Sequence, residues 1–113
     1  MSPFADTPPA LVGHFRVART AGLLPPLHFT KRIGAGGRGV TAVLGLPLFP
    51  FRVIALAPDR VELRYVALPI RDELSRTADG WRGRGLLWGR EFCQFALTPS
   101  ERTTAARPLN GHG

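Results

Sequence analysis

Short runs in which apolar and polar residues alternate occupy most of the sequence between residues 11 and 98. Alternation with a period of two is typical of strands with one buried face, because successive side chains of a strand point to opposite sides of the sheet. A proline-rich corner is expected at Gly45–Pro50. The expected strands are Leu11–Arg19, Val40–Leu44, Phe51–Ala57, Arg60–Ala67, Ile70–Thr77, Trp81–Trp88 and Arg90–Thr98.

Two segments allow a second interpretation. Leu27–Ile33, which stands between a double proline and a glycine-rich stretch, fits either a strand or a helical turn. Ile70–Thr77 also fits a short helix from Pro69 to Gly80, because proline suits the start of a helix and glycine its end. We favour the strand for Ile70–Thr77, since a helix there would bury only two large side chains.

Turn sequences join the expected strands closely. Pro58-Asp59 and Asp79-Gly80 each connect two alternating runs, and both dipeptides are typical of tight hairpins. Glycine (13) and proline (11) together supply 24 of the 113 residues, too many for a helical bundle. The sequence therefore predicts an all-β fold, an antiparallel up-and-down meander of seven or eight strands that closes into a small barrel.

The two ends of the chain differ in composition from the middle. Residues 1–10 and 99–113 contain few large apolar side chains, and we expect both to be flexible tails. The single barrel domain is expected to span residues 11–98.

The Pro58-Asp59 turn sets an expected register for its hairpin. If these two residues form the loop, Ile54 faces Leu63. Two residues further from the turn, Arg52 then faces Tyr65. This face is mainly apolar, so it is expected to point inward and to carry Arg52 with it. A buried guanidinium needs an anionic partner, because an unpaired buried charge is costly.

The Asp79-Gly80 turn places further polar residues inward. In this hairpin Asp72 and Arg76 share the expected inner face with Trp81. On the last strand, Glu91 has the same parity as the alternating apolar residues that follow it. The sequence thus predicts a small polar set at one end of an apolar interior.

These residues predict a binding pocket. The expected ligand-binding residues are Arg52, Tyr65, Arg76, Trp81, Leu63 and Ile54. Arg52 and Tyr65 would hold the carboxylate or hydroxyl of a hydrophobic or amphipathic small molecule, because such pockets combine apolar walls with a few convergent polar groups. Gly83 and Gly85 leave space on the inner face for a neighbouring aromatic ring or for a ligand.

Two alternatives to ligand binding stay open at this point. The polar set can be an internal network of salt bridges around the tyrosine that needs no ligand. The barrel can also be a small enzyme, a cyclase, isomerase or hydratase, with Asp72, Glu91 and Tyr65 as candidate catalytic residues. A carboxylate would then move a proton, and the phenol would stabilise charge on oxygen.

The charge balance adds a further alternative. The sequence has 15 basic and 8 acidic residues, a net charge of +7, which invites a nucleic-acid partner. The arginines are spread along the chain without a cluster, so we do not favour that partner. A homodimer is left open.

The cysteine content and the apolar runs bear on the compartment. The single cysteine, Cys93, excludes an internal disulfide. The sequence shows no leader peptide and no apolar run of about 20 residues, the length that spans a bilayer. We expect a cytoplasmic protein without a membrane span.

Two motifs that suggest a cofactor or a metal lack the right context. Gly34–Gly39 matches G-x-G-x-x-G, and Asp59 lies 20 residues beyond it, as in dinucleotide-binding folds. The preceding strand is too polar for a buried parallel sheet, and no room is left for the following helix. His14, His28 and Cys93 lack the spacing of zinc ligands. We expect neither a cofactor nor a metal.

Two segments resemble a known family. Leu11–Phe15, with the sequence L-V-G-H-F, resembles the first strand of lipocalin-like (calycin) barrels, in which a Gly-x-Trp closes the barrel floor; here Phe15 replaces the tryptophan. Gly80–Leu97, which ends in R-E-F-C-Q-F-A-L, is similar to the last strands of small intracellular members. The resemblance implies an up-and-down barrel that binds an apolar small molecule, and it identifies neither the ligand nor a reaction.

Overall fold

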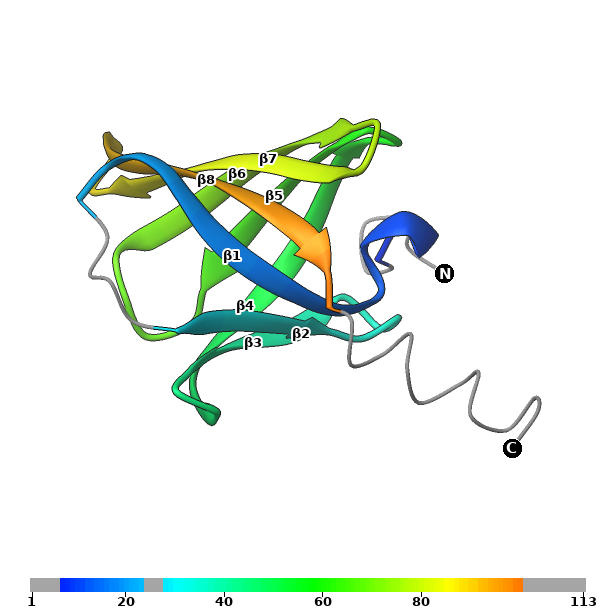
Figure 1. Ribbon diagram of the computed structural model, residues 1–113, viewed down its shortest axis with the longest axis horizontal. Coiled ribbons are helices and arrows are strands. Elements are labelled where there is room, and N and C mark those ends of the chain that lie inside the picture. Colours follow the sequence, from blue (N-terminus) through cyan, green and yellow to red (C-terminus); the bar gives the residue numbers. More distant parts are fainter. Residues whose placement is uncertain (1–6, 24–27, 101–113) are drawn as a thin grey trace.

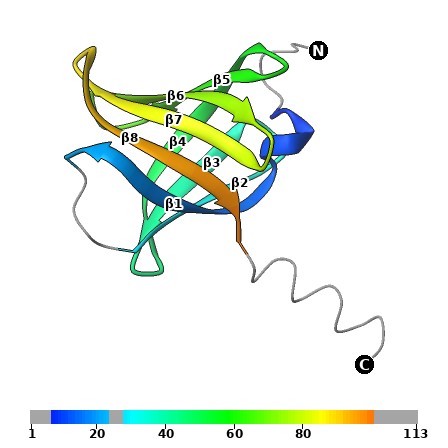
Figure 2. The ribbon, with the colours of Figure 1, turned by 45° about the horizontal axis from the view of Figure 1, so that its top comes forward.

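The computed structural model describes residues 7–23 and 28–100, which form a closed antiparallel barrel of eight strands (Figure 1). The strands are β1 (Gly13–Gly22), β2 (Phe29–Ile33), β3 (Arg38–Val43), β4 (Leu46–Ala57), β5 (Arg60–Tyr65), β6 (Ile70–Thr77), β7 (Gly80–Leu87) and β8 (Arg90–Pro99). Each strand pairs with the next, and β8 lies between β7 and β1 (Figure 2), so the sheet has no free edge. The predicted all-β meander is confirmed. Within the described ranges, no helix is long and apolar enough to cross a membrane.

The segments with two interpretations are strands. In the segment Leu27–Ile33, residues 28–33 contain β2, and Leu27 lies outside the described residues. The segment Ile70–Thr77 is β6. The predicted proline-rich corner is wrong, because residues 46–50 are the first part of β4. The register shifts between Thr41 and Ala42 and leaves Leu48 as an extra residue. Prolines are tolerated near strand ends and bulges, which explains how β4 accommodates Pro47.

Part of the stretch that we assigned to the N-terminal tail packs on the barrel. Pro9–Leu11 is a 3-10 helix, and Leu11 is fully buried. The Thr7 hydroxyl donates to the Gly34 carbonyl and accepts from the Gly37 N–H. This contact ties the segment to the β2–β3 turn, so packing begins before residue 11. Residues 1–6 and 101–113, most of both predicted tails, lie outside the described residues.

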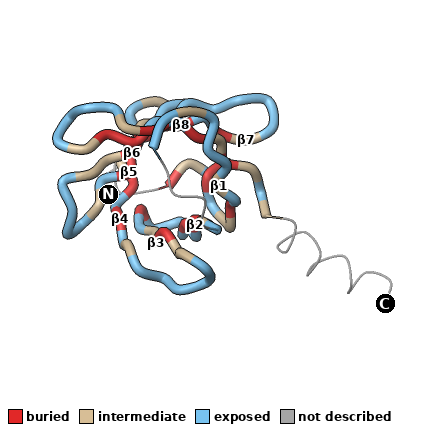
Figure 3. Tube along the Cα trace, turned by 60° about the vertical axis from the view of Figure 1, so that its left-hand side comes forward, coloured by how far each residue is buried: buried red, intermediate tan, exposed pale blue. Residues whose placement is uncertain are grey.

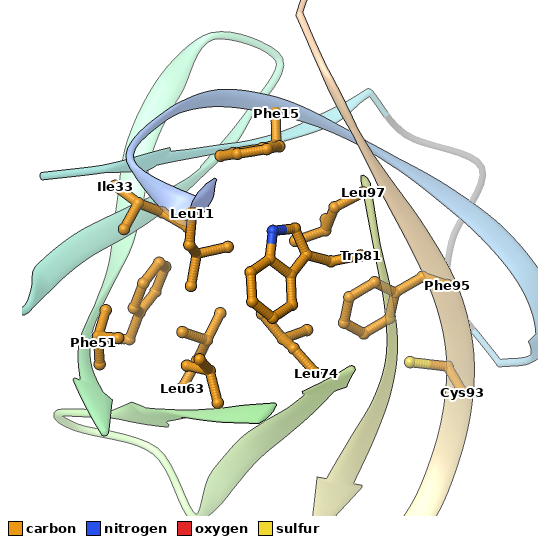
Figure 4. Close-up of a cluster of buried hydrophobic side chains, with 12 residues drawn as sticks. Leu11, Phe15, Ile33, Phe51, Leu63, Leu74, Trp81, Cys93, Phe95 and Leu97 are labelled. Carbon is orange, nitrogen blue, oxygen red and sulfur yellow. The ribbon is translucent and has the colours of Figure 1, made fainter. Parts of the chain in front are cut away.

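The apolar core fills the end of the barrel next to this 3-10 helix, and we call it the closed end (Figure 4). Trp81 lies at its centre, and its indole N–H donates to the Ala10 carbonyl at 3.2 Å. Burial of each large apolar side chain stabilises the fold by about 1.5–3 kcal/mol. The buried side chains around Trp81 are Leu11, Phe15, Ile33, Phe51, Val53, Val61, Leu63, Leu74, Cys93, Phe95 and Leu97.

A β-bulge changes the register of the β4–β5 hairpin. Leu56 is an extra residue in β4, because the register shifts between the residues on either side of it. Beyond the bulge, Arg52 pairs with Arg64 and Ile54 pairs with Glu62, on the outer face. The prediction that Arg52 and Ile54 point inward was wrong. Counted outward from the turn, one inserted residue reverses the face of every side chain of the strand that lies beyond it.

A second bulge lies between β7 and β8. Phe92 is the extra residue, so Glu91 pairs with Leu86. The Glu91 carboxylate lies outside the barrel, where Arg84 Nη1 is 3.3 Å away and Gln94 Nε2 is 2.9 Å away. The predicted inward position of Glu91 was therefore wrong for the same physical reason.

The β6–β7 turn begins one residue earlier than expected, at Ala78. Each residue of β6 therefore pairs with a β7 residue two positions away from the expected partner. A shift of two residues leaves the inner and outer faces unchanged, and Asp72 and Trp81 are buried as predicted. Arg76 shares this parity but is exposed. It pairs directly with Trp81 at the closed end, where the indole already fills the interior. The prediction that Arg76 contributes to the interior was wrong.

Candidate functional site: a buried lysine cluster beneath a cavity

A buried cation lies inside the barrel. Lys31 is the only lysine in the sequence, and its side chain is 4% exposed. Its Nζ lies 3.2 Å from Asp72 Oδ2. It also donates to Thr41 Oγ1 and to Tyr65 OH, each at 2.7 Å. All three ammonium protons therefore have an acceptor within the protein.

Tyr65 and Thr41 complete the network. The Tyr65 hydroxyl donates to Asp72 Oδ2 at 3.1 Å, and it lies 2.8 Å from Thr41 Oγ1. Because the phenol proton is directed to the carboxylate, the Thr41 hydroxyl is the donor in the second contact. We call these four residues the Lys31 cluster; they come from β2, β3, β5 and β6. Their hydrogen bonds close on one another, which offsets the cost of removing two charges from water.

Aromatic rings surround the ammonium. Lys31 Nζ lies 5.3 Å from the ring centroids of Phe51 and Tyr65, and 5.7 Å from that of Phe95. A cation within about 6 Å of a ring face is attracted by the negative charge there. The rings thus stabilise the ammonium where water is excluded.

The cluster keeps Lys31 charged and Tyr65 neutral at neutral pH. Burial alone would lower the pKa of Lys31, but the Asp72 carboxylate and the Tyr65 hydroxyl outweigh it and raise that pKa above its ordinary value. Burial also raises the pKa of the Tyr65 phenol, and the attraction of Lys31 offsets this only in part. Neither group changes its charge near pH 7.

A cavity of about 190 Å³ lies next to the Lys31 cluster, which supplies the polar part of its lining. The apolar lining includes Val17, Phe29, Phe49, Ile70, Phe92 and Phe95. Phe29 and Ile70 each begin a strand, and Phe49 and Phe92 lie close to the start of theirs. These strand ends all lie opposite the closed end. The cavity therefore belongs to this other end of the barrel, which we call the open end.

The structure separates the residues that we predicted to form one site. Of the six predicted ligand-binding residues, Tyr65 alone borders the cavity. Leu63 and Trp81 lie in the filled core of the closed end, and Arg52, Ile54 and Arg76 lie outside the interior. Of the three candidate catalytic residues, Tyr65 and Asp72 meet in the Lys31 cluster, whereas Glu91 is on the outer surface.

Sequence reasoning missed Lys31 and Thr41. A signal for Lys31 was present, because it alternates with Phe29 and Ile33 and so shares their inward face once the segment is a strand. It is also the only lysine beside 14 arginines. Thr41 carries no comparable signal, since threonine is common on either face of a strand.

Other chemistry near the cavity is limited. Cys93 borders it, and burial raises the pKa of its thiol, so the side chain is a protonated, weakly reactive group. In the part of the chain that the structure describes, no three His, Cys, Asp or Glu side chains gather closely enough to hold a metal ion.

Comparison with protein-family models, with curated proteins and with solved structures found no significant match to this chain. The eight-stranded closed antiparallel barrel agrees with the lipocalin-like architecture at the level of strand number and connectivity.

Proposed function

We propose that the barrel binds a small, mainly apolar molecule in the cavity beside the Lys31 cluster. The supporting observation is a cavity of about 190 Å³ that combines aromatic walls with one convergent polar group. An apolar cavity of about 150 Å³ is enough to bind benzene. The ligand is therefore the size of one ring or of two fused rings.

The Lys31 cluster favours a ligand with a neutral hydrogen-bond donor. The protons of Lys31 and Tyr65 already have acceptors, so an incoming carboxylate would have to displace one of them. A carboxylate has about four lone-pair sites that can accept hydrogen bonds. Lys31 and Tyr65 both contact Oδ2 of Asp72, so these two contacts occupy only two of the sites. A hydroxyl or N–H of the ligand can use the others. This proposal replaces the anchor that we expected from Arg52.

A distant relationship to lipocalin-like barrels is part of this proposal. Phe15 is buried at the closed end, two residues after Gly13, where the family places a tryptophan. A cytoplasmic location is also proposed, and the single, unpaired thiol of Cys93 supports it.

The enzyme alternative gains no support from the cluster. General acids and bases work best when their pKa lies near the working pH. The pKa values of both Lys31 and Tyr65 are raised away from neutrality, by attraction to Asp72 in the first case and by burial in the second.

Calorimetric titration with matched probes tests the proposal. Phenol and 2-naphthol carry a neutral donor, benzene and naphthalene carry no polar group, and benzoate and 2-naphthoate are anionic. We expect the neutral donors to bind most tightly and the anions least. Replacing Ile70 with tryptophan should fill the cavity and abolish binding, whereas Leu56→Trp, on the exposed surface at the closed end, should not. The absence of binding by all six probes, or binding that survives Ile70→Trp, would overturn the proposal.

A further inference from the structure

The most exposed apolar side chains lie at the open end of the barrel. Seven large apolar side chains of the described residues are more than half exposed, and Leu56 alone of these is at the closed end. The other six are Leu23, Leu44, Leu46, Leu48, Val66 and Trp88, which we call the apolar rim. They lie in or beside the four connections on the left in Figure 1, and Figure 3 brings that side forward. Isolated exposed leucines are common, but a concentration of this kind marks an interaction surface.

Two rim residues occupy positions that their side chains disfavour. Leu44 and Trp88 have positive φ values of 53° and 49°, and each precedes a glycine that is also at positive φ. Two-residue hairpin turns of this kind are normally Asn-Gly or Gly-Gly, because bulky residues are strained there. The fold itself does not need an apolar side chain at either turn. A leucine and a tryptophan at these tips therefore indicate a function for the exposed side chains.

The charges around the rim are basic. Arg19 donates to the carbonyl of Gly22 beside the rim, and Arg90 directly follows the β7–β8 turn; both are exposed.

The six acidic residues that the structure describes offer no free negative charge there. Asp59 and Asp79 lie in turns at the closed end, and Asp72 is buried against Lys31. The other three, Glu62, Glu73 and Glu91, form salt bridges with arginines. The rim thus combines apolar tips with positive charge that none of these six acidic residues neutralises, in a chain of net charge +7.

We propose that the apolar rim docks on a lipid bilayer that contains anionic lipids. The rim side chains come from four separate connections around one end of the barrel, so a broad surface can contact them together. Leucine and tryptophan side chains enter the bilayer interface, and arginines are attracted to anionic headgroups. Docking does not require an occupied cavity. If the proposed ligand binding also holds, docking places the cavity end against the membrane and lets an apolar ligand transfer without crossing water.

Vesicle binding by the full chain tests this proposal. The probes are vesicles of phosphatidylcholine alone and of phosphatidylcholine mixed with phosphatidylglycerol. Trp88 is 77% exposed and Trp81 is 1% exposed, so Trp88 reports docking by a blue shift of its emission. We expect the shift with the mixed vesicles, a much weaker one with phosphatidylcholine, and weakening by salt. Leu46→Ser should lower the affinity for mixed vesicles at least about tenfold, because it removes one leucine that docking would bury in the bilayer.

The matched control is Leu56→Ser, which removes a leucine of similar exposure at the closed end, 56% against 60% for Leu46. It should leave vesicle binding unchanged. Absence of binding to mixed vesicles, or equal losses in the two variants, would overturn the proposal. Self-association in ultracentrifugation that Leu46→Ser abolishes, without vesicle binding, would assign the rim to a second copy of the chain and likewise reject the bilayer. The probe titrations are a separate assay, so failure of docking and failure of ligand binding can be told apart.

Discussion

Replacing Lys31 with methionine removes the buried ammonium while keeping a flexible chain of similar length. Asp72 then retains a carboxylate that is 6% exposed and has lost its cation. Breaking a buried ion pair by removing one partner costs about 3–5 kcal/mol, because the remaining charge is neither paired nor hydrated. Small domains have a total stability of about 5–15 kcal/mol, so we expect Lys31→Met to lose a large part of it.

A second replacement shows whether the unpaired charge is the cause. In the double variant Lys31→Met/Asp72→Asn, no charge is left in the cluster, and the amide oxygen of the introduced asparagine can still accept from Tyr65. We expect this variant to be more stable than Lys31→Met by at least about 2 kcal/mol. Arg64→Met is the control for loss of a surface ion pair. Arg64 Nη2 lies 2.8 Å from Glu62 Oε2, but its side chain is 63% exposed, so the loss should be under about 1 kcal/mol.

Urea unfolding followed by circular dichroism measures these differences. The reasoning is refuted if Lys31→Met costs no more than Arg64→Met, because the cluster would then not depend on charge pairing. It is also refuted if the double variant loses the sum of what its two single variants lose. Full additivity would mean that Lys31 and Asp72 stabilise the barrel independently.

Burial inside the barrel leads to three further predictions. Burial raises the pKa of Cys93 and Tyr65, and pairing with Asp72 raises that of Lys31, from ordinary values of 9.0, 10.0 and 10.5. The folded state therefore keeps protons that the unfolded chain loses, so stability should hold up to about pH 9 and fall as the pH rises further. Tyr65 is the only tyrosine, so tyrosinate absorbance should show it ionising above pH 10.0, and ionisation at or below that value would contradict its burial. Gly83→Ala should destabilise the barrel by about 1–3 kcal/mol, because its Cβ would lie 2.5 Å from the Phe95 ring. Gly36→Ala, whose Cβ has no neighbour within 4 Å, should be nearly neutral, and urea unfolding compares the two variants.

The strands and their order were predictable because alternation and turn residues are local signals. Every segment that alternates around Pro58-Asp59 and Asp79-Gly80 is a strand in the structure. The face of the sheet that each side chain occupies was less predictable, because one inserted residue reverses the inner and outer faces of the rest of the strand. No glycine or other sequence signal marks Leu56 or Phe92 as a bulge.

The polar site was predictable in part. Strand β5 contains no extra residue between the turn and Tyr65. The inward orientation of Tyr65 was therefore predicted correctly from the turn. Asp72 also followed, because the β6–β7 register moved by two residues and kept its parity. The buried cation was wrongly predicted to be Arg52, because the bulge at Leu56 turns the Arg52 side chain to the outer face. Lys31 was missed because the sequence left open whether its segment is a strand. Only the closed barrel brings Lys31 of β2 next to Asp72 of β6.

Closure of the sheet through β1 and β8 links the beginning of the domain to its end. Phe15 pairs with Pro99, so the final contacts form between residues that are far apart in the chain. During synthesis, β1 and β7 each present an unpaired strand edge until the β8 segment has left the ribosome. Pairings of such high sequence separation form slowly, typically in milliseconds to seconds. A nascent chain of this protein therefore passes through a stage in which an edge of its first strand is available for pairing with other chains.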